Sequence, residues 1–297
     1  MSKTWDAIIV GAGPAGASCA VWLRHLGLDP LIIESTDRIG GLAARNPFDD
    51  IWTVTSPGQT GAEVAVQIAS QVQAAGVDVW FRTQVKAVTG TYPSFTVDVM
   101  RAGQDVERLR AKTIVVATGV RPKELPGSSH ERFDGVIIGP GDEIMSTEFD
   151  QTRVALLGGG DNAFENYSFV KQRGATQACI YARTVRAQKQ FVDQVPAADL
   201  VVGPTTVDPR AKTVNGHAYD WILVLYGWQA NIDFLNALPL TLDNRGFVHT
   251  DMVDAQTSIS GIYAIGEVAQ RMHPCVPTAM ADGVVAAKAI EKRLTTN

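Results

Sequence analysis

The sequence is short of cysteine, of basic charge and of long apolar runs. Its 297 residues include three cysteines, Cys19, Cys179 and Cys275, too few and too scattered for a disulfide framework or a tetrahedral zinc site. Lys and Arg number 26 against 31 Asp and Glu, which argues against a general binder of nucleic acid or anionic membranes. The longest clean apolar run, residues 221–228, falls far short of the ~20 residues that cross a bilayer. We therefore expect a cytoplasmic protein with no membrane span, no nucleic-acid partner and no metal site.

The sequence does contain the same supersecondary motif twice. The first copy runs from a strand at 6–10 through a glycine turn and a helix to a second strand at 30–33. The second copy starts with a strand at 153–157 and reaches its second strand at 177–181. Each copy is a βαβ unit. The repeat predicts an α/β fold of two Rossmann-like, three-layer nucleotide-binding domains, with boundaries near residues 118 and 241.

The first glycine turn, residues 11–16, has the form Gly-x-Gly-x-x-Gly between a strand and a helix. Its glycines allow a tight turn, close approach of a pyrophosphate to the backbone, and close packing of helix on sheet. The N-terminus of the following helix supplies positive potential. Glu34 ends the next strand, where an acid accepts hydrogen bonds from a ribose diol. These features together predict a dinucleotide site.

The second glycine turn, residues 158–163, has the form Gly-x-Gly-x-x-Ala. No acid stands at the end of its second strand, and Arg183 and Arg186 lie just beyond that strand. Arginines at this place favour a 2′-phosphate, and hence NADPH over NADH. Two nucleotide folds in one chain suggest two cofactors that exchange electrons.

Five short motifs in this order make the chain resemble the low-molecular-weight thioredoxin-reductase-like flavoproteins. The motifs are Gly11 to Gly16 with Glu34, Gly40-Gly41-Leu42, Ala117-Thr118-Gly119, Gly158 to Ala163, and the run from Thr257 to Val268. The resemblance implies a homodimer. It also implies an FAD domain made of residues 1–118 and 242–297, with an NAD(P) domain at 119–241 inserted between them.

The same resemblance implies which residues hold each cofactor. For FAD they are Gly11, Gly13, Pro14, Ala15, Gly16, Glu34, Ser35, Gly41, Leu42, Val85, Ala117, Thr118, Gly119, Gly266, Glu267, Val276, Pro277 and Thr278. For NADP they are Gly158, Gly160, Asp161, Asn162, Ala163, Arg183 and Arg186. Glu267 stands where the family usually has Asp, so its carboxylate is one methylene further from the backbone.

The chain departs from thioredoxin reductases at one decisive place. Those enzymes carry Cys-x-x-Cys just before the second glycine turn, and the matching window, residues 138–145, has no cysteine. Without paired thiols, electrons cannot pass to thioredoxin by dithiol exchange. The chain is then nearest in type to the related ferredoxin or flavodoxin NADP reductases. Residues 188–220 leave little room for the usual helix and three-stranded meander, so a lost NADP site in a ferredoxin-linked flavoprotein stays an alternative.

Two residues are candidates for a catalytic role. Cys275, two residues after His273, falls beside the flavin when residues are counted from Gly266, and a thiolate there could act on a small disulfide or thiol substrate. Asp142 could donate a proton near flavin N5. The plainer interpretations are a small packing residue for Cys275 and a surface turn acid for Asp142. A flavin-dependent disulfide or thiol oxidoreductase and a non-catalytic flavin module therefore stay open beside the reductase.

Overall fold

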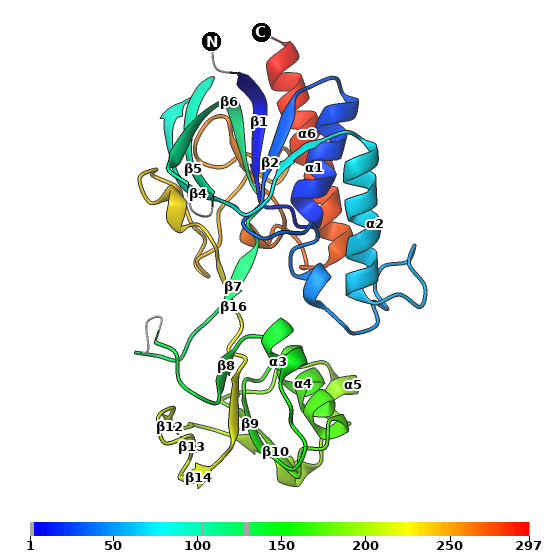
Figure 1. Cartoon of the computed structure of the whole chain (residues 1–297), viewed down its shortest axis with the longest axis vertical. Helices are drawn as coiled ribbons and strands as arrows, with labels where there is room; N and C mark the ends of the chain where they lie inside the picture. Colours follow the sequence, from blue (N-terminus) through cyan, green and yellow to red (C-terminus); the bar gives the residue numbers. More distant parts are fainter. Residues whose placement is uncertain (1–2, 102–103, 128–130, 297) are drawn as a thin grey trace. The chain divides into compact units, whose positions relative to one another are not determined.

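The computed structural model describes residues 3–101, 104–127 and 131–296. The chain folds into two compact units (Figure 1). The first unit joins Met1–Val120 to Ala230–Asn297, and the second is Arg121–Gln229. The second unit thus ends before the boundary near 241 that the motifs suggest. The reason is local: Asn231 bonds to Thr118 and Gly119 through its backbone, and Leu235 is buried in the first unit.

A seven-stranded sheet forms the centre of the first unit. Five of its strands run parallel in the order β3-β2-β1-β6-β17, and β5 and β4 extend it in antiparallel fashion from β6. The strands are β1 (Thr4–Val10), β2 (Pro30–Ile33), β3 (Asp78–Trp80), β4 (Thr83–Thr91), β5 (Ser94–Arg101), β6 (Val106–Val116) and β17 (Ile262–Ala264). The four residues of β2 are all buried, as expected for a parallel strand covered on both faces.

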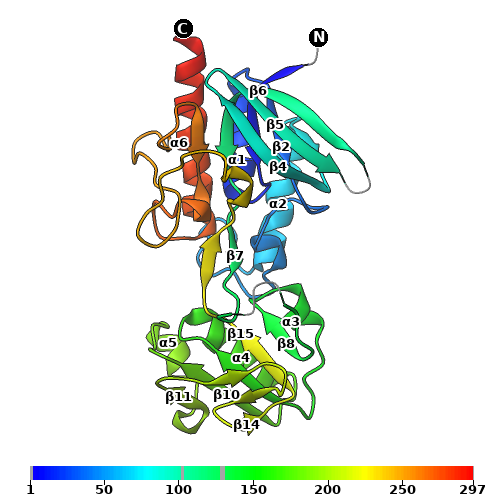
Figure 2. The ribbon, with the colours of Figure 1, turned by 90° about the vertical axis from the view of Figure 1, so that its left-hand side faces the viewer.

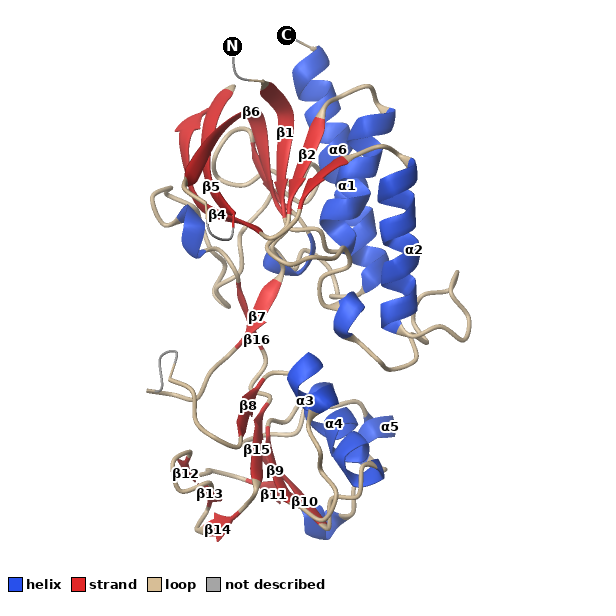
Figure 3. Ribbon diagram, in the orientation of Figure 1, coloured by secondary structure: helices blue, strands red, loops and turns tan. Residues whose placement is uncertain are grey.

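Helices α1 (Pro14–His25), α2 (Gly61–Ala74) and α6 (Val276–Thr295) gather on one side of the parallel strands, and Figure 3 shows them in blue. Short 3₁₀ turns η1 (Ala43–Arg45), η3 (Asp233–Leu235) and η4 (Gly266–Val268) connect the elements. The meander of β4, β5 and β6 is best seen in Figure 2. No helix within the described residues has the length and apolar character needed to cross a membrane.

The second unit has a five-stranded parallel sheet in the order β11-β10-β9-β15-β8. Val154 and Leu156 of β9 contribute to one hydrophobic cluster and Ala155 and Leu157 to another, because successive side chains of a strand point to opposite faces. The elements are β8 (Val136–Ile138), α3 (Asp142–Ser146), β9 (Arg153–Leu157), α4 (Asp161–Gln172), β10 (Gln177–Ala182), α5 (Lys189–Val192), η2 (Ala197–Asp199), β11 (Leu200–Val202) and β15 (Trp221–Val224). The two clusters make this unit three-layered, as the repeated motif predicts.

Residues 188–220, which the sequence analysis expects to leave little room for a helix and a meander, contain reduced forms of both. This stretch holds the one-turn helix α5 and the antiparallel strands β12 (Val207–Asp208), β13 (Thr213–Val214) and β14 (His217–Ala218). The meander fits because each strand is two residues long. A further pair, β7 (Val120–Pro122) and β16 (Trp228–Ala230), forms a two-stranded sheet where the chain passes from one unit to the other.

The packing of α6 on α1 yields a first prediction. A Cβ added at Gly283 would lie 2.5 Å from the carbonyl oxygen of Ala15 and 2.7 Å from the amide nitrogen of Cys19. Gly283→Ala therefore forces the two helices apart, and we expect it to lower the free energy of unfolding by about 1–3 kcal/mol. Urea denaturation of the ligand-free protein measures this loss.

The matched control for that experiment is Gly13→Ala. Gly13 has φ −67° and a Cβ there meets nothing within 4 Å, so the same substitution should leave the ligand-free protein as stable as the wild type. Equal losses at the two positions would contradict the close helix contact.

Candidate cofactor sites

The first glycine turn is closed by contacts that only glycine permits. A Cβ at Gly11 would lie 2.4 Å from the carbonyl oxygen of Ala117, and a Cβ at Gly16 would lie 2.1 Å from that of Gly11. Gly11 also has φ +104°, which side chains of L residues rarely allow. Gly13, in contrast, faces open space. The turn is thus packed against β6 on one side and accessible to a ligand on the other.

The N-terminus of α1 has no side-chain cap. Its N-cap is Gly13, and Pro14 stands at the first helical position. The amides of the first turn therefore keep their hydrogen-bonding capacity, and the helix dipole adds positive potential at the same point. An uncapped helix end behind a glycine turn fits the pyrophosphate of a dinucleotide.

Glu34 lies directly beside this turn. Its Oε2 accepts the amide of Ala12 at 2.8 Å and its Oε1 accepts the amide of Thr36 at 2.8 Å. The side chain of Ser35 donates to the same Oε1 at 3.3 Å, and the Glu34 residue is 7% exposed. A carboxylate has about four acceptor positions, so a ribose diol can still bind to Glu34.

Other predicted FAD residues converge on the same turn. A Cβ at Gly41 would lie 3.1 Å from the Cα of Gly13, and a Cβ at Gly266 would lie 2.9 Å from the Cβ of Ala15. Leu42, next to Gly41, is the N-cap of η1. The structure thus brings residues 11–16, 34, 41, 117 and 266 together from five separate segments of the first unit.

Three of the remaining FAD assignments are Val85, which lies in β4, and Thr118 and Gly119, which lie between β6 and β7. Val85 is buried in β4, and the amide of Thr83 in the same strand donates to the backbone oxygen of Glu34 at 2.9 Å. Thr118 donates through Oγ1 to the carbonyl of Asn231 at 2.7 Å, and Gly119 follows it. These contacts join the start of β4, two residues before Val85, to Glu34, and they join residues 118–119 to Asn231.

Glu267 and the start of α6 border one small cavity. The cavity is about 10 Å³, and Gly266, Glu267, Cys275, Thr278 and Asp282 are among its lining residues. Within the described residues, no group donates a hydrogen bond to the Glu267 carboxylate, and burial raises its pKa. A half-buried carboxylate without a donor suits a ligand with hydroxyl groups. Val276 and Pro277 form the first turn of α6 beside it.

The second glycine turn repeats the first in its geometry. A Cβ at Gly158 would lie 2.4 Å from the carbonyl oxygen of Leu225, and one at Gly159 would lie 2.0 Å from that of Thr184. Gly160 faces open space and is the N-cap of α4, again without a side-chain cap. Ala163 is fully buried in the first turn of this helix.

The loop that carries Arg183 and Arg186 is anchored to the second glycine turn. The amide of Arg186 donates to the carbonyl of Gly159 at 2.6 Å. The Asp161 carboxylate accepts the backbone amide of Gln188 at 2.7 Å and its side-chain amide at 2.9 Å. Both arginines are exposed. Gln188 is a residue that sequence reasoning missed, because its partner lies 27 residues away.

Asn162 and Glu165 lie near the start of α4. The backbone oxygen of Asn162 accepts the side chain of Asn166 at 2.7 Å. Burial, and to a smaller extent the charge of Asp161, raises the pKa of Glu165. The start of α4 therefore carries two acids, Asp161 and Glu165, while the backbone amides of its first turn have no side-chain cap.

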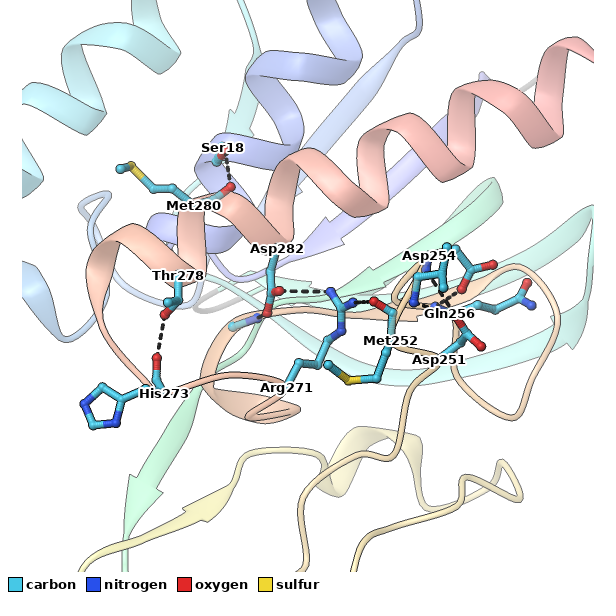
Figure 4. A network of polar contacts seen from close by, with 12 residues as sticks. Ser18, Asp251, Met252, Asp254, Gln256, Arg271, His273, Thr278, Met280 and Asp282 are labelled. Carbon is cyan, nitrogen blue, oxygen red and sulfur yellow. Dashed lines mark hydrogen bonds and ion pairs between the residues drawn. The ribbon is translucent and has the colours of Figure 1, made fainter.

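The two catalytic candidates lie in different units. Cys275 is the N-cap of α6 in the first unit, and its Sγ lies 3.3 Å from Oγ1 of Thr278. His273 meets Thr278 through its backbone oxygen, and its imidazole is exposed (Figure 4). Asp142 opens the short helix α3 in the second unit and is exposed. In the part of the chain that the structure describes, no three His, Cys, Asp or Glu residues are grouped as metal ligands.

Two uncapped helix ends, each behind a glycine turn in its own α/β unit, define a flavin- and pyridine-nucleotide-dependent oxidoreductase. The family described as pyridine nucleotide-disulphide oxidoreductase matches residues 5–283, and the chain belongs to this family. It is an FAD-dependent oxidoreductase that uses NADPH, which confirms the cofactors expected from the sequence.

Named relatives and solved structures agree with this membership. A ferredoxin–NADP reductase of Limosilactobacillus fermentum is 30% identical over 90% of this chain and 86% of its own length. A thioredoxin reductase of Chlamydia trachomatis is 25% identical over 97% of both chains. The structure of Lactococcus lactis thioredoxin reductase covers 99% of this chain and 100% of its own, with TM-score 0.82 at 22% identity. This last likeness confirms the predicted fold.

The raised pKa of Glu267 gives a second prediction. The folded chain holds this proton more tightly than the unfolded chain does, so stability falls as pH rises from about 4.3 through the folded-state pKa. Glu267→Gln removes this loss. We expect the ligand-free variant to be more stable than the wild type at pH 7 and equal to it at pH 4, by denaturant titration at both pH values. If the stabilities of the variant and the wild type differ by the same amount at pH 4 and pH 7, the pKa of Glu267 is not raised in the folded chain.

Proposed function

We propose that this enzyme transfers electrons from NADPH, by way of FAD, to a one-electron carrier protein of the ferredoxin or flavodoxin type, without a dithiol intermediate. The observation that carries the proposal is the arrangement of the three thiols. All are free, and the window before the second glycine turn has none. Electrons must then leave from the flavin itself.

Two of the thiols are unsuited to redox exchange. Cys19 is fully buried in α1 and Cys179 is 6% exposed in β10. Burial raises the pKa of both thiols, which keeps them protonated and unreactive. Cys275 is half-buried and stands alone, so it has no second thiol with which to form an internal disulfide.

The relatives' names support the choice of acceptor. Both ferredoxin–NADP reductases and thioredoxin reductases are similar to the chain along most of its length. The thioredoxin reductases' dithiol route needs a cysteine pair that this sequence lacks. A ferredoxin-type partner is therefore the better assignment. The homodimer implied by the resemblance and the cytoplasmic location expected from the cysteine content remain part of the proposal.

The chain's own residues have defined tasks in this proposal. Bound FAD would supply the redox chemistry, namely the coupling of a two-electron donor to a one-electron acceptor. The N-terminus of α1 and Glu34 hold its adenosine pyrophosphate. The N-terminus of α6 would supply positive potential that stabilises negative charge on the reduced flavin. In the second unit, α4 and the two arginines bind NADPH.

A thiol enzyme that uses Cys275 is the second candidate, favoured by the position of this residue at the cavity beside Glu267. The test is a third prediction. Under anaerobic conditions NADPH should bleach the flavin, and wild type and Cys275→Ala should reduce a ferredoxin or flavodoxin at rates within about twofold of each other, because no step uses the thiol.

The outcomes of this experiment separate the candidates. Loss of turnover in Cys275→Ala with retained bleaching would replace the proposal with a thiol mechanism. Failure of NADPH to bleach the wild-type flavin would indicate a flavoprotein whose NADP site is lost.

The arginine loop gives a fourth prediction. Replacing both Arg183 and Arg186 with Ala removes the cations that would contact a 2′-phosphate, so KM for NADPH should rise at least tenfold, about 1.4 kcal/mol, while KM for NADH is unchanged. Steady-state kinetics with each nucleotide measures the difference. Arg173→Ala is the control, since Arg173 is exposed in the same unit and stacks on Phe169. Equal effects on NADPH and NADH would remove the arginines from nucleotide selection.

A further inference from the structure

A buried ion pair between Arg271 and Asp282 lies next to the Gly266–Glu267 turn. Nη1 of Arg271 is 2.9 Å from Oδ1 of Asp282, and the two side chains are 5% and 8% exposed (Figure 4). Nη2 of Arg271 donates to the backbone oxygen of Met252. The pair thus joins α6 to the segment after η4 and to the loop at Met252, three parts of the first unit.

The second carboxylate oxygen of Asp282 holds the turn itself. Oδ2 accepts the amide of Gly266 at 3.1 Å. Gly266 has φ +72°, and its Cα packs against Ala15 so closely that a Cβ would lie 2.9 Å from the Cβ of Ala15. Asp282 therefore fixes the orientation of the Ile265–Gly266 peptide, one residue before Glu267.

Asp282 is itself fixed relative to the first glycine turn. Its neighbour Gly283 packs against the backbone of Ala15, at the distance given above for the helix packing. Oγ of Ser18 in α1 donates to the backbone oxygen of Met280 at 2.8 Å. Because these two contacts flank Asp282 along α6, the carboxylate holds Gly266 at a set distance from the N-terminus of α1.

Arg271 supplies the charge that this arrangement needs. Asp282 is a buried carboxylate close to the turn that would meet an anionic cofactor, and Arg271 is the cation that neutralises it. Nε of Arg271 is buried and has no acceptor among the described residues, so the arginine gives up one hydrogen bond at this position.

We propose that Asp282 and Arg271 are positioning residues for FAD. Asp282 orients the Gly266–Glu267 turn next to the N-terminus of α1, and Arg271 neutralises the charge of Asp282 near the FAD site. This inference rests on the assignment of Gly266 and Glu267 to the flavin site within the proposed function. It assigns no contact between FAD and either residue.

The competing explanation is a pair that only stabilises the fold. Buried ion pairs are weak sources of stability, because desolvation offsets most of their attraction, but removal of one partner is strongly destabilising. FAD affinity and the stability of the ligand-free protein must therefore be measured separately.

The experiment titrates ligand-free protein with FAD and follows the quenching of flavin fluorescence. Asp282→Leu removes the acceptor of the Gly266 amide, and Arg271→Met leaves the carboxylate uncompensated; each should raise the Kd for FAD at least tenfold. Asp282→Asn keeps an acceptor oxygen and should change Kd less than threefold. The double variant Arg271→Met with Asp282→Asn should bind FAD more tightly than Arg271→Met alone, because it leaves no unpaired charge.

Arg293→Met is the matched control. Arg293 lies on the same helix and bonds to Tyr263, Ser260 and Gln256, so its loss should lower stability without changing the Kd for FAD. If Arg271→Met leaves the Kd for FAD unchanged, as Arg293→Met does, the proposal is overturned, and the comparison of Arg271→Met with the double variant decides the matter even where Asp282→Leu does not fold. Wild type that binds FAD tightly but reduces no ferredoxin or flavodoxin would overturn the proposed function and leave this inference standing.

Discussion

Close packing of backbone on backbone at the two glycine turns is the constraint on which the rest of the structure depends. At the first turn the backbone at Gly11 packs against Ala117, just after β6, and at the second the backbone at Gly158 packs against Leu225, just after β15. Side chains would hold these elements apart. Because the helices can then dock directly on their sheets, each helix N-terminus is left at the carboxyl edge of the sheet, uncapped and next to an open glycine.

The two turns share geometry but differ in the charge that follows. Glu34 follows the second strand of the first motif and is tied to the turn through the amide of Ala12. In the second motif no acid follows, and the loop with Arg183 and Arg186 is tied back to Gly159 and Asp161 instead. The same backbone frame therefore presents an acceptor in one unit and cations in the other. We expect this difference to let one chain distinguish a ribose diol from a phosphorylated ribose.

The parts of the fold that follow local rules could be predicted from the sequence. The strands expected at 6–10, 30–33, 153–157 and 177–181 are found at Thr4–Val10, Pro30–Ile33, Arg153–Leu157 and Gln177–Ala182, because apolar runs bounded by glycine turns are local signals. Strand β4 was missed, since a register shift between Val85 and Ala87 moves the buried positions from odd to even numbers and hides the alternation. The partners of Asp161 and of Asp282 depend on tertiary packing, so no local pattern indicates them.

The cost of burying Arg271 and Asp282 bears on how the flavin site is built. A pair of charges that is nearly excluded from water gains little net stability over apolar side chains of similar size. Helix α6 already docks on α1 through Gly283 and Ser18, so the pair is not needed to attach the helix. What apolar residues could not supply is an acceptor for the Gly266 amide in its left-handed conformation. We therefore infer that the Asp282 carboxylate is retained because the peptide that carries the Gly266 amide must be held in one orientation. Arg271 is needed in turn, because a buried carboxylate without a cation beside it would repel the anionic FAD of the proposal.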